Sequence, residues 1–178
     1  GPVFHTTAQS GREPERIARQ ISPESLTLLD PKAASAALAN AKALAAALGA
    51  GGLSVVSGLA RGIDTAAHGG ALEAGAITVG VIASGVDVPY PPENAGLAVR
   101  ITERGAVVSE RPLGAAPQAR HFPRRNRVIS GLALGVVVVE AAPGSGSLIT
   151  ARLAAEQGRE VMAVPGTPLD PRHKGTNQ

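Results

Sequence analysis

A cluster of arginines around one phenylalanine is the part of this sequence best suited to binding anions. No acidic residue occurs between positions 111 and 139. The arginines of this stretch are Arg111, Arg120, Arg124, Arg125 and Arg127. Guanidinium groups bind phosphate oxygens in pairs, and an aromatic ring stacks on a base. Phe122, one of two phenylalanines in the chain, therefore predicts a site for single-stranded nucleic acid.

Other interpretations of this cluster stay open at the level of sequence. The arginines could form a solvated basic surface, and Phe122 could fill the core. At least one arginine is expected to pair internally. Asn126 could hold its loop through hydrogen bonds to the backbone instead of contacting a ligand.

Two glycine-containing loops add backbone amides that could bind a phosphate. Residues 57–64 (SGLARGID) join an apolar segment to a helix start and supply Arg61 and Gly62. Residues 144–150 (GSGSLIT) open a second helix, with Ser147 as its expected cap. Amides at a helix start favour anions, although an ordinary strand–helix connection is the alternative for both loops. Neither loop matches a dinucleotide or Walker A fingerprint, so the motifs do not support those cofactors.

Composition limits the classes of protein that fit. The chain has 178 residues, 44% of them hydrophobic, with no cysteine, four histidines and a formal net charge of +3. One domain with a small appendage is expected, without disulfides, a metal site or a membrane span. No leader pattern opens the chain, which favours the cytoplasm. No paired carboxylates or Ser/His/Asp set emerges, so we expect neither catalytic residues nor a cofactor.

Strand-like and helix-like segments alternate along the chain. The expected strands are 53–57, 77–83, 106–109, 135–139 and 160–164, and the expected helices are 33–48, 64–74, 94–104, 124–133 and 148–157. The strands are continuous apolar runs, which indicates a parallel sheet buried on both faces. We predict an α/β fold, Rossmann-like, with a mainly parallel sheet and helices on both faces. Ligands of such folds bind beyond the carboxyl ends of the strands.

The domain organisation divides near position 30. Residues 1–30 are polar and are expected to be an irregular remnant, with one short helix over 13–21. Residues 31–178 are expected to form the Rossmann-like domain. A third loop of interest, residues 165–177, leaves the last strand and brings Lys174 and Asn177 toward the same ligand; a tail without a role is its alternative.

Taken together, these loops resemble the DNA-processing A (Smf-type) family. The matching pieces are residues 57–64 (SGLARGID), 90–94 (YPPEN), 122–127 (FPRRNR), 145–152 (SGSLITAR) and 175–177 (GTN). The resemblance implies a non-enzymatic, homodimeric Rossmann-like protein that binds single-stranded DNA and loads the RecA recombinase during natural transformation. By motif position, it implies DNA contacts from Arg61, Gly62, Phe122, Arg124, Arg125, Asn126, Arg127, Ser145, Gly146, Ser147, Lys174 and Asn177.

One turn departs from the family pattern. A Gly-Ser-Arg turn is usual before the helix that matches 33–48, whereas this chain has Asp30, Pro31 and Lys32. Lys32 is expected to replace the arginine as a point charge without its bidentate fork, and Asp30 would repel phosphate.

Two other functions remain as alternatives. Residues 143–147 (PGSGS) look like part of the phosphate loop of nucleoside-monophosphate phosphoribohydrolases of the lysine-decarboxylase-like family. That loop needs a glutamate close behind it, and here no acid appears before Glu156, which argues against hydrolysis. The third interpretation is a scaffold that recruits proteins.

Overall fold

The computed structural model describes residues 3–8, 33–166 and 171–177 of the chain. The predicted helix over 13–21 and the turn that contains Lys32 lie outside the described residues. The strands are β1 (Val3–Ala8), β2 (Leu53–Ser57), β3 (Thr78–Ile82), β4 (Ala106–Ser109), β5 (Gly135–Val138) and β6 (Glu160–Ala163). The helices are α2 (Ala33–Ala50), α3 (Ile63–Glu73), α4 (Ala95–Thr102), α5 (His121–Leu132) and α6 (Gly146–Glu156), with 3-10 turns η2 (Pro92–Asn94) and η3 (Pro171–His173).

The strands form one six-stranded sheet in the order β4-β3-β2-β1-β5-β6. β2, β3 and β4 pair in parallel, as do β5 and β6, while β1 is antiparallel to both β2 and β5. β2 and β5 therefore run in the same direction. The carboxyl ends of β2 to β6 consequently lie along one edge of the sheet, which is called the rim below. The predicted α/β fold with a mainly parallel sheet is confirmed.

β1 corrects one expectation from the sequence. Residues 1–30 were expected to be irregular, yet Val3–Ala8 lies in the middle of the sheet. His5 is opposite both Val56 of β2 and Val136 of β5. Two neighbouring strands satisfy the backbone of β1 from both sides, and a six-residue segment gives no sign of such long-range pairing. The domain boundary near position 30 stays a prediction.

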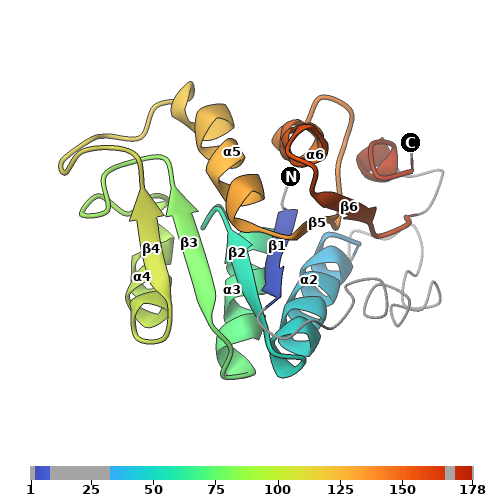
Figure 1. Cartoon of the computed structure of the whole chain (residues 1–178), viewed down its shortest axis with the longest axis horizontal. Helices are drawn as coiled ribbons and strands as arrows, with labels where there is room; N and C mark the ends of the chain where they lie inside the picture. Colours follow the sequence, from blue (N-terminus) through green and yellow to red (C-terminus); the bar gives the residue numbers. More distant parts are fainter. Residues whose placement is uncertain (1–2, 9–32, 167–170, 178) are drawn as a thin grey trace.

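Helices cover both faces of the sheet (Figure 1). Val55 faces a core cluster with residues of α2 and α3, whereas the next residue, Val56, packs with Ile129 of α5. Val136 and Val138 pack beneath α6. Because successive side chains of a strand point to opposite faces, both faces are apolar, which explains the continuous apolar runs in the sequence.

Small residues bring α2 and α3 close together. Ala41 and Ala45 of α2 and Ala71 of α3 are fully buried in their shared core cluster. Gly70 lies against the backbone of α2, where an ideal Cβ would be 2.1 Å from the carbonyl oxygen of Lys42. This close contact sets the position of α3 against α2. The loop after β2 leads directly into the first turn of α3, so the contact also helps to place that loop. No helix in the described part of the chain is long and apolar enough to cross a membrane.

Candidate nucleic-acid interface

The loop after β2 is held by a buried carboxylate. Asp64, in the first turn of α3, accepts hydrogen bonds from the backbone N–H groups of Gly58 and Ala60, each at 3.1 Å. Gly62 occupies the N-cap position of α3, and the Asp64 carboxylate turns back to accept from the two loop amides. Burial raises the pKa of Asp64, and the positive charge of Arg125 lowers it.

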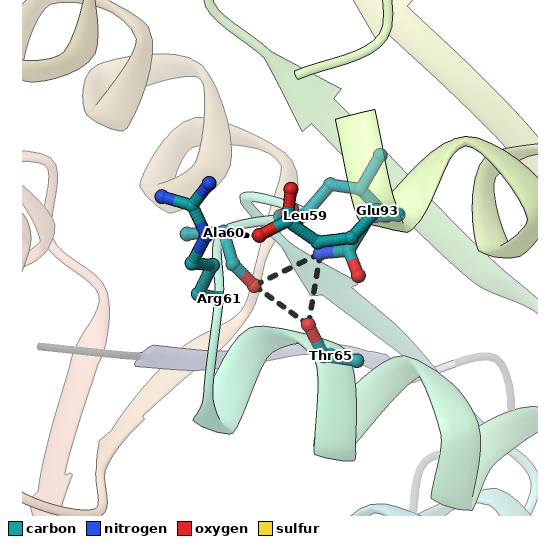
Figure 2. Close-up of polar contacts among 6 residues, drawn as sticks. Leu59, Ala60, Arg61, Thr65 and Glu93 are labelled. Atoms are coloured by element: carbon teal, nitrogen blue, oxygen red, sulfur yellow. Dashed lines mark hydrogen bonds and ion pairs between the residues drawn. The ribbon is translucent and has the colours of Figure 1, made fainter. Parts of the chain in front are cut away.

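The carbonyl side of the same loop is held by Asn94 and Thr65 (Figure 2). The Asn94 amide donates to the carbonyl oxygen of Leu59 and to Thr65 Oγ1, both at 2.9 Å, and Thr65 Oγ1 donates to the carbonyl of Ala60 at 2.9 Å. Leu59 is fully buried with φ of 57°, a left-handed conformation that is uncommon outside glycine. These bonds hold the loop in that conformation, so the site is formed before a ligand arrives. The roles of Asn94 and Thr65 were not predicted from the sequence. Asn94 acts on the backbone of Leu59, 35 residues earlier, and Thr65 acts on the backbone of Ala60, 5 residues earlier.

Arg125 of α5 is turned toward the interior of the protein. Only 8% of it is exposed, and its guanidinium donates to the carbonyl oxygens of Gly58, at 2.6 Å, and Val81. Its Nε donates to Asn126 Oδ1 at 3.1 Å. Burial lowers the pKa of Arg125, while Asp64 raises it. The buried guanidinium is bound to protein acceptors, as was expected for at least one arginine of the cluster. The direct contact of Arg125 with DNA stays a prediction.

A cavity of about 230 Å³ opens beside this loop at the ends of β2 and β3. Its walls are Gly58, Ala60, Arg61, Ala83, Ser84, Tyr90, Pro91, Pro117 and Phe122. The rings of Tyr90 and Phe122 meet edge to face, with centroids 5.9 Å apart. Phe122 is half-buried in the first turn of α5, and Arg61 is exposed at the mouth. Two of the predicted contact residues, Arg61 and Phe122, therefore line one cavity, together with Tyr90.

Two rim arginines are paired with carboxylates. Arg61 forms an ion pair with Glu93, and Arg127 forms one with Glu110, all four side chains being well exposed. The hydrogen bond with Glu93 raises the pKa of Arg61, and the same bond lowers the pKa of Glu93. Exposed pairs of this kind contribute little to stability, so a phosphate can displace the carboxylate. Arg124 is exposed on the same helix.

The second glycine loop begins α6. Ser145 occupies the N-cap position, and Ser147, the expected cap, lies inside the helix fully buried, its Oγ 2.9 Å from Ser145 Oγ. Gly146 is exposed with open space where a Cβ would lie. Asn126 Nδ2 donates to the carbonyl of Gly146 at 3.3 Å, which joins α5 to this loop. The structure thus brings Asn126 and residues 145–147 together, with Asn126 using its amide on backbone.

The segment after β6 folds back along the rim. Asn177 pairs with the backbone of Gly166 through both amide atoms, at 3.1 Å and 3.0 Å. The N–H of Gly175 donates to the carbonyl of Ala141 at 2.8 Å, which ties the segment to the end of β5. Lys174 is exposed. Asn177 therefore fastens the end of this segment to Gly166, and Lys174 presents an exposed positive charge. No group of metal-binding side chains occurs among the described residues.

The fold and the site together define a Rossmann-like domain with an aromatic pocket and rim arginines at the carboxyl edge of its sheet. The model of one family, DNA recombination-mediator protein A, matches residues 31–178. The chain belongs to this family.

Individual relatives agree with that assignment. The chain is 52% identical over 125 residues to Protein Smf of Escherichia coli, an alignment that covers 70% of this chain and 33% of that protein. It is 52% identical over 118 residues to DNA processing protein DprA of Streptococcus pneumoniae, covering 66% of this chain and 42% of that protein. The chain thus spans well under half the length of these curated relatives.

Solved structures show the same fold. The crystal structure of DNA processing protein A from Streptococcus pneumoniae aligns with a TM-score of 0.72 and 41% identity, covering 89% of this chain and 51% of that one. DNA processing protein A from Helicobacter pylori, which binds single-stranded DNA, aligns with a TM-score of 0.73 and 24% identity, covering 98% of this chain and 76% of that one.

Proposed function

We propose that this domain binds single-stranded DNA at the rim and takes part in DNA processing during natural transformation. The observation that carries the proposal is the cavity that Tyr90 and Phe122 line together, with Arg61 exposed at its mouth. A ring beside a guanidinium serves an unpaired base and its phosphate together. The bases of a duplex are stacked and paired, so they are not available to such a pocket. Membership in the family and the DNA-binding Helicobacter pylori relative support the same conclusion.

The other parts of the rim extend the proposed binding surface. Arg124 and Arg127 of α5, the exposed amides at Gly146 and the ammonium group of Lys174 would bind the backbone on the far side of the pocket. Gly62 lets the chain approach a phosphate closely, since its φ of 86° is left-handed. Ser145 and Ser147 shape the start of α6. Lys32 belongs to the proposed contacts by motif position alone.

The proposal includes the role of the domain in the cell. The domain acts by binding and not by catalysis, forms a homodimer in the cytoplasm, and presents the DNA to the RecA recombinase. Family membership supports these points. Light scattering tests the dimer. The rate at which RecA nucleates on DNA coated with a competing binding protein tests the loading.

The first test is binding of fluorescent poly-dT, followed by anisotropy at two salt concentrations, with a duplex of equal length beside it. Tight, salt-sensitive binding that favours the single strand is expected, because phosphate neutralisation releases counterions. Tyr90 provides an internal probe, since it is the only tyrosine in a chain without tryptophan. Its fluorescence should change on binding. Equal affinity for the duplex, or an unchanged Tyr90 signal, would count against the pocket.

Replacing Arg61 with alanine should weaken DNA binding and flatten the salt dependence by roughly one phosphate contact. The reason is that Arg61 is exposed at the mouth of the cavity, where an exposed ion pair with Glu93 holds it. The matched control is Arg104→Ala, an exposed arginine that donates to the carbonyl of Gly75 at the opposite edge of the sheet. If Arg61→Ala and Arg104→Ala bind DNA with the same salt slope, Arg61 makes no phosphate contact.

Replacing Phe122 with alanine should reduce affinity for single-stranded DNA by about 1–3 kcal/mol, roughly 5- to 150-fold, if a base stacks on its ring. Phe122→Leu is the control, because leucine retains apolar volume in the half-buried position and lacks the ring face. Both variants should lose affinity, the leucine variant with little loss of thermal stability. If leucine binds DNA as the wild type does, Phe122 serves packing only.

A further inference from the structure

One buried arginine connects the two walls of the proposed DNA pocket. Arg125 lies three residues after Phe122 in α5, so both side chains are on the same face of the helix. Its guanidinium carbon is 5.8 Å from the centre of the Phe122 ring. The same guanidinium donates to Gly58, three residues before Arg61. It also donates to Val81 of β3.

We propose that Arg125 is a positioning residue: its buried guanidinium locks the loop of residues 58–61 to α5 and so sets Arg61 and Phe122 at the spacing that an unpaired nucleotide requires. The inference rests on the proposed DNA-binding function. The role of Arg125 differs from the role proposed for the exposed rim arginines. Arg125 donates to protein carbonyls, whereas Arg61, Arg124 and Arg127 would bind the phosphates.

Gly58 has the shape that this arrangement needs. An ideal Cβ on Gly58 would lie 2.5 Å from Nη1 and 2.7 Å from the guanidinium carbon of Arg125. The planar guanidinium therefore lies directly against the backbone of Gly58. The side chain of any larger residue at position 58 would occupy the space that the guanidinium fills. The loop at this point is also held from the other side, by the Asp64 carboxylate. Gly58 is thus clamped between a buried anion and a buried cation.

Lysine cannot reproduce this arrangement. The N–H groups of a guanidinium are fixed in one plane, and here the Nη1 of Arg125 donates to the carbonyls of Gly58 in the loop and of Val81 in β3. An ammonium is a point charge on a flexible stem. Arg125→Lys therefore keeps the charge that balances Asp64 and removes the fixed geometry. The matched control is Arg104→Lys, which changes an arginine–carbonyl contact at the opposite edge of the sheet.

The first measurement is hydrogen exchange of the Gly58 and Ala60 amides, which requires no DNA. In Arg125→Lys these amides should exchange at least about tenfold faster, since a buried charged hydrogen bond contributes more than the 1.4 kcal/mol that corresponds to tenfold. The amides of β5 should be unchanged, and Arg104→Lys should leave all of them unchanged. Unaltered exchange at Gly58 and Ala60 in Arg125→Lys would overturn the inference.

The second measurement is the salt dependence of binding to poly-dT. Arg125→Lys should lose about tenfold or more in affinity with the same salt slope as the wild type, because no phosphate contact is removed. Gly58→Ala should have the same effect, and the double variant should be no worse than either single one. The double variant Arg125→Met/Asp64→Asn is compared with the single variant Asp64→Asn. If the salt slope of the double variant is lower by one phosphate contact, Arg125 binds DNA directly and the inference is overturned.

These variants separate the two proposals. The Arg125→Met/Asp64→Asn pair removes both buried charges together, so it tests the role of the guanidinium even if Arg125→Met alone does not fold. If the wild type fails to bind single-stranded DNA, the proposed function falls, while the exchange of Gly58 and Ala60 still decides whether Arg125 positions the loop.

Discussion

Lowering the pH from about 7 to about 4.5 should destabilise the wild type by roughly 2–3 kcal/mol more than His68→Leu. His68 on α3 is fully buried, and burial, followed by the charge of Arg125, lowers its pKa to about 3. The unfolded chain binds a proton near the ordinary value of 6.5, and the folded chain does not. Stability is therefore lost as the pH falls from about 6.5 toward 3 and levels off below that range.

The hydrogen bonds of His68 explain why it is neutral. Thr78 Oγ1 donates its proton to the carbonyl of Val55 at 2.8 Å. His68 Nδ1 lies 2.7 Å from Thr78 Oγ1, so Nδ1 must be the donor of that second hydrogen bond. Nε2 is then an unprotonated acceptor, and it is buried with no hydrogen-bond partner among the residues that the structure describes. A second proton on this ring would find no acceptor among those residues. NMR of the ring nitrogens should show the Nδ1–H tautomer.

The measurement is urea unfolding of both proteins across this pH range. Asp64 works in the opposite direction in both, because its raised pKa lets the folded state take up a proton before the unfolded state does. The difference between the two proteins isolates His68 from that effect. Parallel stability curves for the wild type and His68→Leu would show that His68 is not held neutral in the folded state.

Replacing Gly70 with alanine should destabilise the fold by about 1–3 kcal/mol, the range for overpacking a close contact. The added methyl would lie 2.1 Å from the carbonyl oxygen of Lys42, so α2 and α3 must separate. The obstacle is backbone, which cannot rotate away as a side chain does. The helix that would move carries Asp64, so the loop of residues 58–61 should loosen as well.

Gly69 is a closely matched control for this prediction. It lies in the same helix, one residue earlier. Apart from its chain neighbours and the backbone of its own helix, no atom of the described residues lies within 4 Å of the position that its Cβ would take. Gly69→Ala should stabilise the protein by about 0.5–1 kcal/mol, because alanine loses less backbone entropy than glycine in a helix. Denaturant midpoints of the two variants should therefore move in opposite directions. Equal shifts would mean that the α2–α3 contact is looser than described.

Local sequence determined most of the strands and helices. The strands at 53–57 and 106–109 were predicted with their observed bounds, because a short continuous apolar run between glycine-containing turns is typical of a buried strand. The alternation of strands and helices predicted that the candidate loops lie at the carboxyl ends of the strands. Arg61 and Phe122 were recognised by residue type alone, and the structure places both at one cavity.

Helix bounds were less well determined. α5 was expected to begin at Arg124, and it begins at His121, so that Phe122 and Pro123 lie in its first turn. Proline is tolerated there because the first N–H groups of a helix have no partner within it. Phe122 is consequently placed by a helix and not by a loop, which fixes its ring more firmly than the sequence indicated.

Only the tertiary structure decided which arginine of residues 120–127 turns inward and which carboxylate receives the loop. Arg125 is buried because α5 crosses above the ends of β2 and β3, where two carbonyls and Asp64 compensate its charge. β1 joins the sheet through pairing with strands that follow it far along the chain. Side-chain type and spacing are local properties, and they determined the elements and the candidate contacts. Burial, compensation of charge and strand pairing depend on residues distant in sequence, so only the folded chain determines them.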